Sequence, residues 1–225
     1  MQDLIKQEQF ELEVLDKLNS KKLLSRVVFC GGTMLRLCHG LNRFSVDLDF
    51  WVTSDIDEEG FFKNVRECLA RSYEITDAAM KFHTMLFEIR SKNYPRRLKL
   101  EVRRETKKIG TENTIAYSPH SNLQVIVTAV RLEELMKSKI EAFLGRDEIR
   151  DLFDMEFLLK KGIKFDGVPI EKLQKVMRNM EKLRTRDYTA KLGPLLEAKE
   201  RAYYSKENFK ILKAAIKAAI RSCDG

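Results

Sequence analysis

The 21-residue segment from Cys30 to Phe50 constrains the fold of this chain most, because it joins a glycine turn to an acidic strand. The apolar run Val27–Cys30 is short and rich in β-branched and aromatic residues, which predicts a buried strand ending at two glycines. The apolar residues that follow favour a short helix that begins at Thr33 and ends at Gly40. The segment therefore predicts a strand, a tight turn and a short helix.

The start of this predicted helix favours phosphate binding. Unpaired backbone N–H groups and partial positive charge at a helix N-terminus attract anions. We expect Thr33 to face outward at this point. Gly31 and Gly32 should let a ligand approach the main chain closely.

The next strand presents two carboxylates on one face. Residues two apart on a strand share a face, so Asp47 and Asp49 should project together from a sheet whose other face is packed by Leu48 and Phe50. Such a pair suits Mg²⁺ or Mn²⁺, and a two-metal site serves in-line phosphoryl displacement. Separately, a Gly-Gly turn is unspecific and an Asp-x-Asp strand is often only a solvated face. In this order, the two motifs favour chemistry on a nucleoside triphosphate.

Two blocks of the sequence carry a family resemblance. GGT followed after thirteen residues by DLDF resembles the first motif of the AbiEii/AbiGii toxin family of nucleotidyltransferase-like proteins, within the DNA polymerase β-like superfamily. SKIEAFLGRDEIRDLFDMEFLL, residues 138–159, resembles the second block of that family, a lysine-bearing helix followed by Arg-Asp-x-x-Asp. The resemblance implies that Gly32 and Thr33 hold the triphosphate, that Asp47 and Asp49 bind metal, and that Lys139 and Asp151 are important for activity.

The wider superfamily has a third metal-binding carboxylate on a neighbouring antiparallel strand. Glu101 is our candidate, because residues 97–103 alternate between apolar positions and an outward face of Lys99, Glu101 and Arg103. The other interpretation of Glu101 is a cross-strand salt bridge among basic neighbours. Arg43 lies four residues before Asp47 and could contact a phosphate, although hydrogen bonds to local carbonyls explain it as well.

Lys139 lies in the apolar stripe of a helix predicted over Arg131–Leu144. A buried ammonium needs a carboxylate or phosphate partner, unless its stem carries it to the surface. The helix predicted over 148–160 is apolar on nearly all sides, so Asp151 and Asp154 on it need partners too. Purely structural partners for these carboxylates would be Lys139, Arg146 and Arg150.

Bulk properties agree with a polyanionic partner. The chain of 225 residues has a net charge of +8, and lysine and arginine recur on the predicted helices after Asp166. These basic faces either contact RNA phosphates or are simply solvated. Four cysteines without Cys-x-x-Cys spacing indicate reduced thiols. With no signal peptide and no long apolar run, we expect a cytoplasmic protein without membrane contact.

The hydrophobic pattern predicts an α+β fold, a polymerase β-like mixed sheet with flanking helices, followed by a helical domain. We expect a nucleotidyltransferase catalytic domain over residues 1–130 and a helical domain over 131–225 whose first two helices complete the active site. The expected elements are helices at 2–24 and 58–72, antiparallel strands within 73–104 with a hairpin turn at 91–95, and a strand at 123–128.

The resemblance implies a Mg²⁺-dependent enzyme that transfers a nucleoside monophosphate from a triphosphate to an acceptor hydroxyl. The implied acceptor is the 3′ end of tRNA, and the implied setting is the toxin of a toxin–antitoxin pair with a cognate antitoxin. A non-catalytic nucleotide- or RNA-binding module of the same fold is the main alternative. An Asp-x-Asp glycosyltransferase is less favoured, because its sheet needs more βαβ units than this pattern shows.

Overall fold

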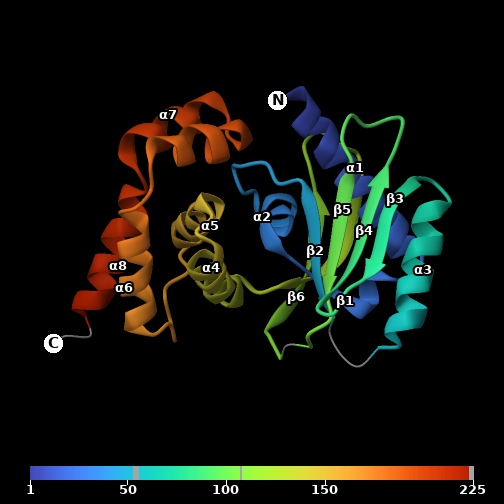
Figure 1. The fold of residues 1–225 in the computed structure, drawn as a ribbon, viewed down its shortest axis with the longest axis horizontal. Coiled ribbons are helices and arrows are strands. Elements are labelled where there is room, and N and C mark those ends of the chain that lie inside the picture. Colours follow the sequence, from blue (N-terminus) through green and yellow to red (C-terminus); the bar gives the residue numbers. More distant parts are fainter. Residues whose placement is uncertain (53–55, 107, 223–225) are drawn as a thin grey trace. The chain divides into compact units, whose positions relative to one another are not determined.

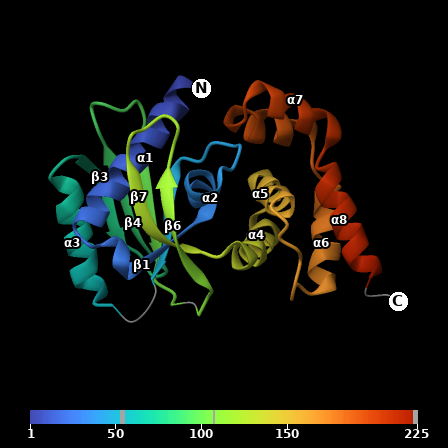
Figure 2. The same cartoon turned by 180° about the vertical axis from the view of Figure 1, so that it is seen from behind.

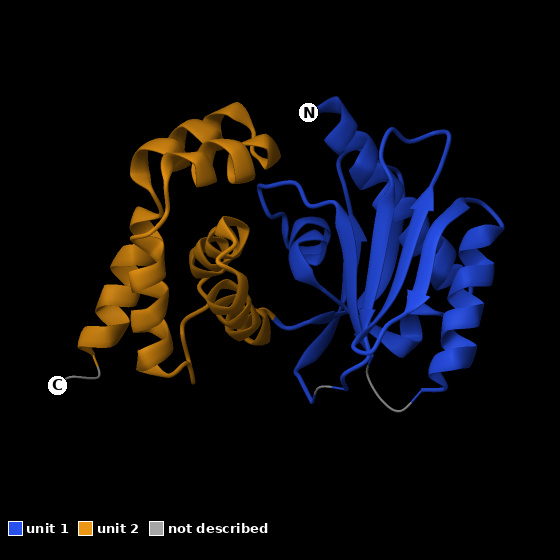
Figure 3. Ribbon diagram, in the orientation of Figure 1, with its two compact units in different colours: residues 1–131 blue, residues 132–225 orange. Residues whose placement is uncertain are grey.

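The computed structural model describes residues 1–52, 56–106 and 108–222, so Cys223 lies outside the described residues. The chain forms two compact units, Met1–Arg131 (unit 1) and Leu132–Gly225 (unit 2), coloured separately in Figure 3. The elements of unit 1 are α1 (Gln2–Ser20), η1 (Leu24–Arg26), β1 (Val27–Cys30), α2 (Gly31–His39), β2 (Asp47–Val52), α3 (Glu58–Ala70), β3 (Glu74–Met80), β4 (Thr84–Arg90), β5 (Leu98–Arg103), β6 (Thr111–Tyr117) and β7 (Gln124–Val130).

Within the described part of unit 1, seven strands form one sheet in the order β3-β4-β5-β2-β1-β7-β6 (Figure 1). β1 pairs with β7 and β2 pairs with β5 in parallel, whereas the other neighbours are antiparallel. The predicted mixed sheet with flanking helices is confirmed. The prediction did not include β6, and it was wrong to place the Glu101 strand antiparallel to the aspartate strand.

Helices cover the sheet of unit 1 (Figure 2). α1 packs on β5 and β7 and contacts α3, which packs on β3 and β4, while α2 packs on β1, β2 and β6. The core between them includes Leu48 and Phe50 of β2, which are 0% and 2% exposed. The ring of Phe50 stacks on Phe29 of β1, with centroids 5.2 Å apart. Since side chains alternate along a strand, Asp47 and Asp49 lie on the opposite face of β2.

The short helix α2 begins two residues earlier than predicted, at Gly31. Its end at Gly40 is as predicted, because Gly40 takes the left-handed conformation with φ 75°. The N–H groups of Gly40 and Leu41 then bond the carbonyls of Arg36 and Leu35, each at 3.1 Å. This closing motif reverses the chain into the segment that leads to β2.

Unit 2 is helical, as predicted, and its core is built around α5. Glu156 is fully buried, and its carboxylate accepts hydrogen bonds from the Tyr204 hydroxyl at 2.9 Å and from the Leu212 N–H at 3.0 Å. It therefore caps the helix that begins at Lys210, whose preceding residue gives no side-chain cap. The elements are α4 (Leu132–Arg146), α5 (Ile149–Lys160), α6 (Ile170–Met180), η2 (Asp187–Leu192), η3 (Gly193–Leu195), α7 (Ala198–Glu207) and α8 (Lys210–Arg221).

Candidate active site

The acidic face of unit 1 is set by the parallel pairing of β2 with β5. In this register Asp47 stands beside Lys99, and Asp49 stands beside Glu101. Neighbouring residues in register share a face of the sheet, so three carboxylates and one ammonium group lie on the same face. The sequence pattern identified the three carboxylates, because the alternation of inward and outward side chains can be recognised within each strand separately. It did not single out Lys99, whose neighbour Asp47 comes from another strand.

Lys99 and Glu101 form an ion pair, with the Lys99 Nζ 2.5 Å from the Glu101 Oε1. The two side chains are 40% and 31% exposed. The pKa of Lys99 is raised, first by its hydrogen bond to Glu101 and then by the negative charges of Glu101, Asp47 and Asp49. Glu101 therefore forms a salt bridge with a basic neighbour, but along its own strand and not across strands as the alternative expected. A metal-ligating role for Glu101 stays a prediction.

The donor set of this face fits a hard divalent cation. Asp47 and Asp49 supply carboxylate oxygens from one strand, the ligand type that Mg²⁺ prefers. The pKa of Lys99 is raised mainly by its hydrogen bond to Glu101, and the negative charges of Asp47 and Asp49 act in the same direction to a smaller extent. Across the described residues, no group of three or more His, Cys, Asp or Glu side chains is gathered closely enough to hold a metal ion. Metal binding by Asp47 and Asp49 stays a prediction.

The two glycines of the turn make room for side chains of the site itself. Gly31 has φ 82°, and a Cβ there would lie 2.5 Å from the Oδ2 of Asp49. A Cβ at Gly32 would collide with the guanidinium of Arg43 and lie 2.8 Å from the hydroxyl oxygen of Ser45. Our expectation was that these glycines leave space for a ligand. In the structure, side chains from the following segment fill the space beside them.

Thr33 is fully buried, so the prediction that it faces outward was wrong. Its hydroxyl donates to the backbone carbonyl of Asp47 at 2.6 Å. The reason is that α2 begins at Gly31, and two extra helical residues turn position 33 toward the sheet. Thr33 therefore ties the first turn of α2 to the start of the aspartate strand.

Arg43 is 3% exposed, and its Nη1 donates to the Phe44 carbonyl at 3.0 Å. This contact is the local hydrogen bonding that we considered as an alternative to phosphate binding. A phosphate contact by Arg43 stays a prediction, because it requires the buried guanidinium to be reached by a ligand.

A buried ion pair holds the segment between α2 and β2. Arg36 donates to the carboxylate of Glu8 on α1 and to the Leu41 carbonyl at 2.9 Å. Its guanidinium also lies 4.0 Å from the centre of the Phe44 ring, a favourable cation–π contact. Ser118 donates its hydroxyl to the same Glu8 carboxylate. We did not predict this network.

Gln7 on α1 fixes the starts of both strands of the acidic face. Its side-chain amide is fully buried, and the Nε2 lies 3.3 Å from the carbonyls of both Val46 and Arg97. These residues immediately precede β2 and β5. Gln7 therefore helps to set the register that places Asp49 beside Glu101.

Glu11, one turn further along α1, is fully buried, and neither of its oxygens has a hydrogen-bond partner among the described residues. Its pKa is raised well above the usual value, first by burial and then by the charges of Glu8 and Asp47. A raised pKa in the folded state means that stability is complete below the pKa of the unfolded chain and falls as the pH rises toward the folded pKa.

We expect Glu11→Gln to remove this loss of stability. The variant should be more stable than wild type at pH 8, and the difference should shrink toward pH 4, where the wild-type carboxyl is protonated in both states. Thermal unfolding followed by circular dichroism at several pH values measures it. Glu13→Gln is a control on the same helix. A difference that does not depend on pH would contradict the assignment.

In unit 2, Lys139 is buried and neutralised by two carboxylates. Its Nζ lies 2.6 Å from the Oδ2 of Asp154 and 3.4 Å from the Oδ1 of Asp151. Arg146 donates from its Nε and its Nη2 to the two carboxylate oxygens of Asp151, at 2.8 Å each. The alternative that Lys139 extends to the surface is therefore wrong, since it is 7% exposed. Asp154, whose role the sequence left open, is the closer partner of the lysine.

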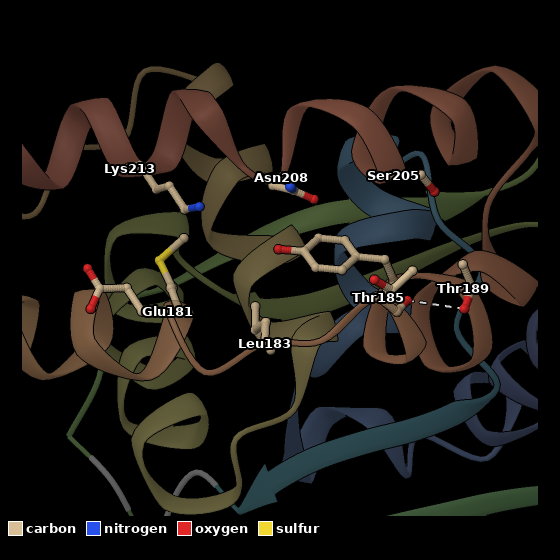
Figure 4. A pocket seen from close by; sticks show the side chains of 9 residues that line it. Glu181, Leu183, Thr185, Thr189, Ser205, Asn208 and Lys213 are labelled. Carbon is tan, nitrogen blue, oxygen red and sulfur yellow. Dashed lines mark hydrogen bonds between the residues drawn. The ribbon is translucent and has the colours of Figure 1, made fainter.

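Unit 2 also contains a small polar pocket of about 230 Å³ (Figure 4). The apolar side chains of Met180 and Leu183 line it together with the charged Glu181 and Lys213. Its other lining residues carry hydroxyl or amide groups: Thr185, Tyr188, Thr189, Ser205 and Asn208. None of the predicted site residues lines this pocket.

Over the described residues, no helix is long and apolar enough to cross a membrane.

Comparison with known proteins agrees with the fold. Two solved structures from Helicobacter pylori are similar: the protein JHP933 (23% identity, TM-score 0.53, 93% of this chain and 97% of that chain covered) and a candidate nucleotidyltransferase (22% identity, TM-score 0.58, 94% and 97% covered). At this identity the likeness establishes the fold, which is that of nucleotidyltransferases. No curated protein matches the chain.

A family model described as "Nucleotidyl transferase AbiEii toxin, Type IV TA system" matches residues 13–224. The chain therefore belongs to the AbiEii nucleotidyl transferase toxin family. The match spans both units and every predicted site residue.

Proposed function

We propose that this chain is a Mg²⁺-dependent nucleotidyltransferase that transfers a nucleoside monophosphate from a triphosphate to the 3′ end of tRNA, as the toxin of a toxin–antitoxin pair. The observation that carries the proposal is the shared face of Asp47 and Asp49, beside the N-terminus of α2 and in register with β5. An antitoxin would be the protein partner, in keeping with the family.

Residues of unit 1 would bind and orient the triphosphate. Asp47 and Asp49 would hold Mg²⁺, which when bound neutralises charge on the phosphates and on the leaving pyrophosphate. The N–H groups at the start of α2 have no acceptor within the helix and can bond phosphate oxygens. Because the Thr33 hydroxyl is engaged with Asp47, we assign these phosphate contacts to the backbone of Gly31–Thr33.

The reaction requires one bond to form and one to break at the α-phosphorus. The acceptor hydroxyl oxygen bonds to this phosphorus on one side while the oxygen of pyrophosphate leaves on the other. The proposal gives Lys139 the role of placing a positive charge near the triphosphate. Asp151 and Asp154 would fix the position of its ammonium group.

Incubation of the full chain with each labelled triphosphate, total tRNA and Mg²⁺ tests the proposal. Wild type should label tRNA, and Asp47→Ala/Asp49→Ala should give no more label than a sample without protein. Asp77→Asn on the edge strand β3 is a matched control, because Asp77 is exposed and lies away from the acidic pair in the strand order. Equal labelling by wild type and the double variant would remove the two aspartates from the mechanism.

A non-catalytic nucleotide- or RNA-binding module is the second candidate. It is favoured by two sets of ion pairs within the protein, Glu101 with Lys99 and Lys139 with Asp151 and Asp154. These charges already have protein partners and do not require a metal ion or a triphosphate. Under this alternative, Asp49→Ala would bind nucleotide and arrest growth as wild type does. Under the nucleotidyltransferase proposal, growth arrest is lost together with labelling.

A further inference from the structure

Lys99 is a cation that the structure places on the same face as the carboxylates of the acidic face. It stands beside Asp47 across the β2–β5 pairing and bonds Glu101 two residues further along its own strand. Asp49 stands beside that same Glu101. The ammonium therefore lies in the field of three carboxylates, two of which are the proposed metal ligands.

An ammonium and a divalent cation on this face are attracted by the same group of carboxylates. A Glu101 oxygen that accepts a hydrogen bond from Lys99 at 2.5 Å offers less electron density to a metal ion. A positive charge on the same face as Asp47 and Asp49 also repels a second cation, and such repulsion is only partly screened at a half-buried surface. Lys99 and the metal ion therefore oppose each other.

The lysine can also move away at small cost. Its side chain is 40% exposed, and an ion pair of this exposure contributes little to stability. Its four-carbon stem lets the ammonium reach water when Glu101 is withdrawn.

We propose that Lys99 competes with the divalent cation for the carboxylates of the acidic face. Lys99 thereby sets the metal concentration at which this face binds the cation. The inference rests on the proposed function, because it assumes that Asp47 and Asp49 are metal ligands. It adds a residue that tunes the site without binding the metal. A salt bridge that served only to stabilise β5 would leave metal affinity unchanged.

Binding of Mn²⁺ to the full chain without nucleotide tests the inference, with free Mn²⁺ measured by electron paramagnetic resonance. Lys99→Met should bind Mn²⁺ about three- to tenfold more tightly than wild type, the size expected for removing one exposed ion pair and its repulsion. Lys99→Arg should bind as wild type does. Arg103→Met is the matched control, since Arg103 is an exposed cation on the same face of β5. It should change the affinity less than about twofold.

Thermal unfolding gives a second readout that does not depend on activity. Lys99→Met should have a lower melting temperature than wild type without metal, because the carboxylates repel one another, and a larger increase on addition of Mg²⁺. Unchanged or weaker Mn²⁺ binding by Lys99→Met would overturn the inference, as would an equal gain in Arg103→Met.

The variant Asp47→Asn/Asp49→Asn separates this inference from the proposed function. If it loses Mn²⁺ binding while Lys99→Met binds as wild type does, the metal site stands and the role of Lys99 is wrong. If it binds Mn²⁺ as tightly as wild type, the proposed ligands are wrong. If neither wild type nor Lys99→Met binds Mn²⁺, both proposals fail.

Discussion

Asp154→Ala is expected to destabilise unit 2 by about 3–5 kcal/mol, because it leaves a buried ammonium without its closest carboxylate. Asp154 is fully buried, and its Oδ2 lies 2.6 Å from the Nζ of Lys139. The remaining partner, Asp151, is further away at 3.4 Å and is already bound by Arg146. The lost ion pair therefore has no ready replacement.

Hydrogen exchange of the α4 and α5 amides measures this effect, since it reports the unfolding free energy of these helices separately from unit 1. Asp166→Ala, at an exposed aspartate of unit 2, is the control and should change exchange little. Replacing both partners with apolar residues, as Lys139→Met/Asp154→Leu, should restore stability to within about 1 kcal/mol of wild type. A loss below about 1 kcal/mol in Asp154→Ala would show that the pair contributes little.

Local sequence patterns predicted the elements of the site well, because they depend on neighbouring residues. The alternation around Asp47 and around Glu101 gave the correct faces, and Gly40 gave the correct end of α2. The apolar surroundings of Lys139 correctly indicated that its charge needs carboxylate partners.

Features that depend on distant parts of the chain were not predictable in the same way. The parallel direction of β5 relative to β2 follows from the strand order of the sheet, and Lys99 gains its importance only from that pairing. An error of two residues in the start of α2 was enough to reverse the orientation of Thr33. β6 was missed because Thr111–Tyr117 is mostly polar, as is usual for a strand at the edge of a sheet.

Burial in unit 1 shows why the polar residues of α1 were overlooked. Gln7, Glu8 and Glu11 look like the solvated side of an ordinary amphipathic helix, yet all three are buried. Gln7 and Glu8 hold the strand starts and the α2–β2 segment, so they support the acidic face without taking part in it. Such positions are recognised by their long-range hydrogen bonds, which a single sequence does not display.

The stabilised variant Lys139→Met/Asp154→Leu also separates the structural role of Lys139 from its proposed chemical role. If the ammonium serves the triphosphate, this folded variant should transfer nucleotide about 10²–10³-fold more slowly than wild type, the usual cost of removing one transition-state charge contact. Lys172→Met controls for loss of positive charge in unit 2, because Lys172 pairs with Glu141 near the surface. Single-turnover labelling of tRNA measures the rate, and hydrogen exchange verifies the fold. Transfer at the wild-type rate by the double variant would show that the buried lysine serves the structure of unit 2 alone.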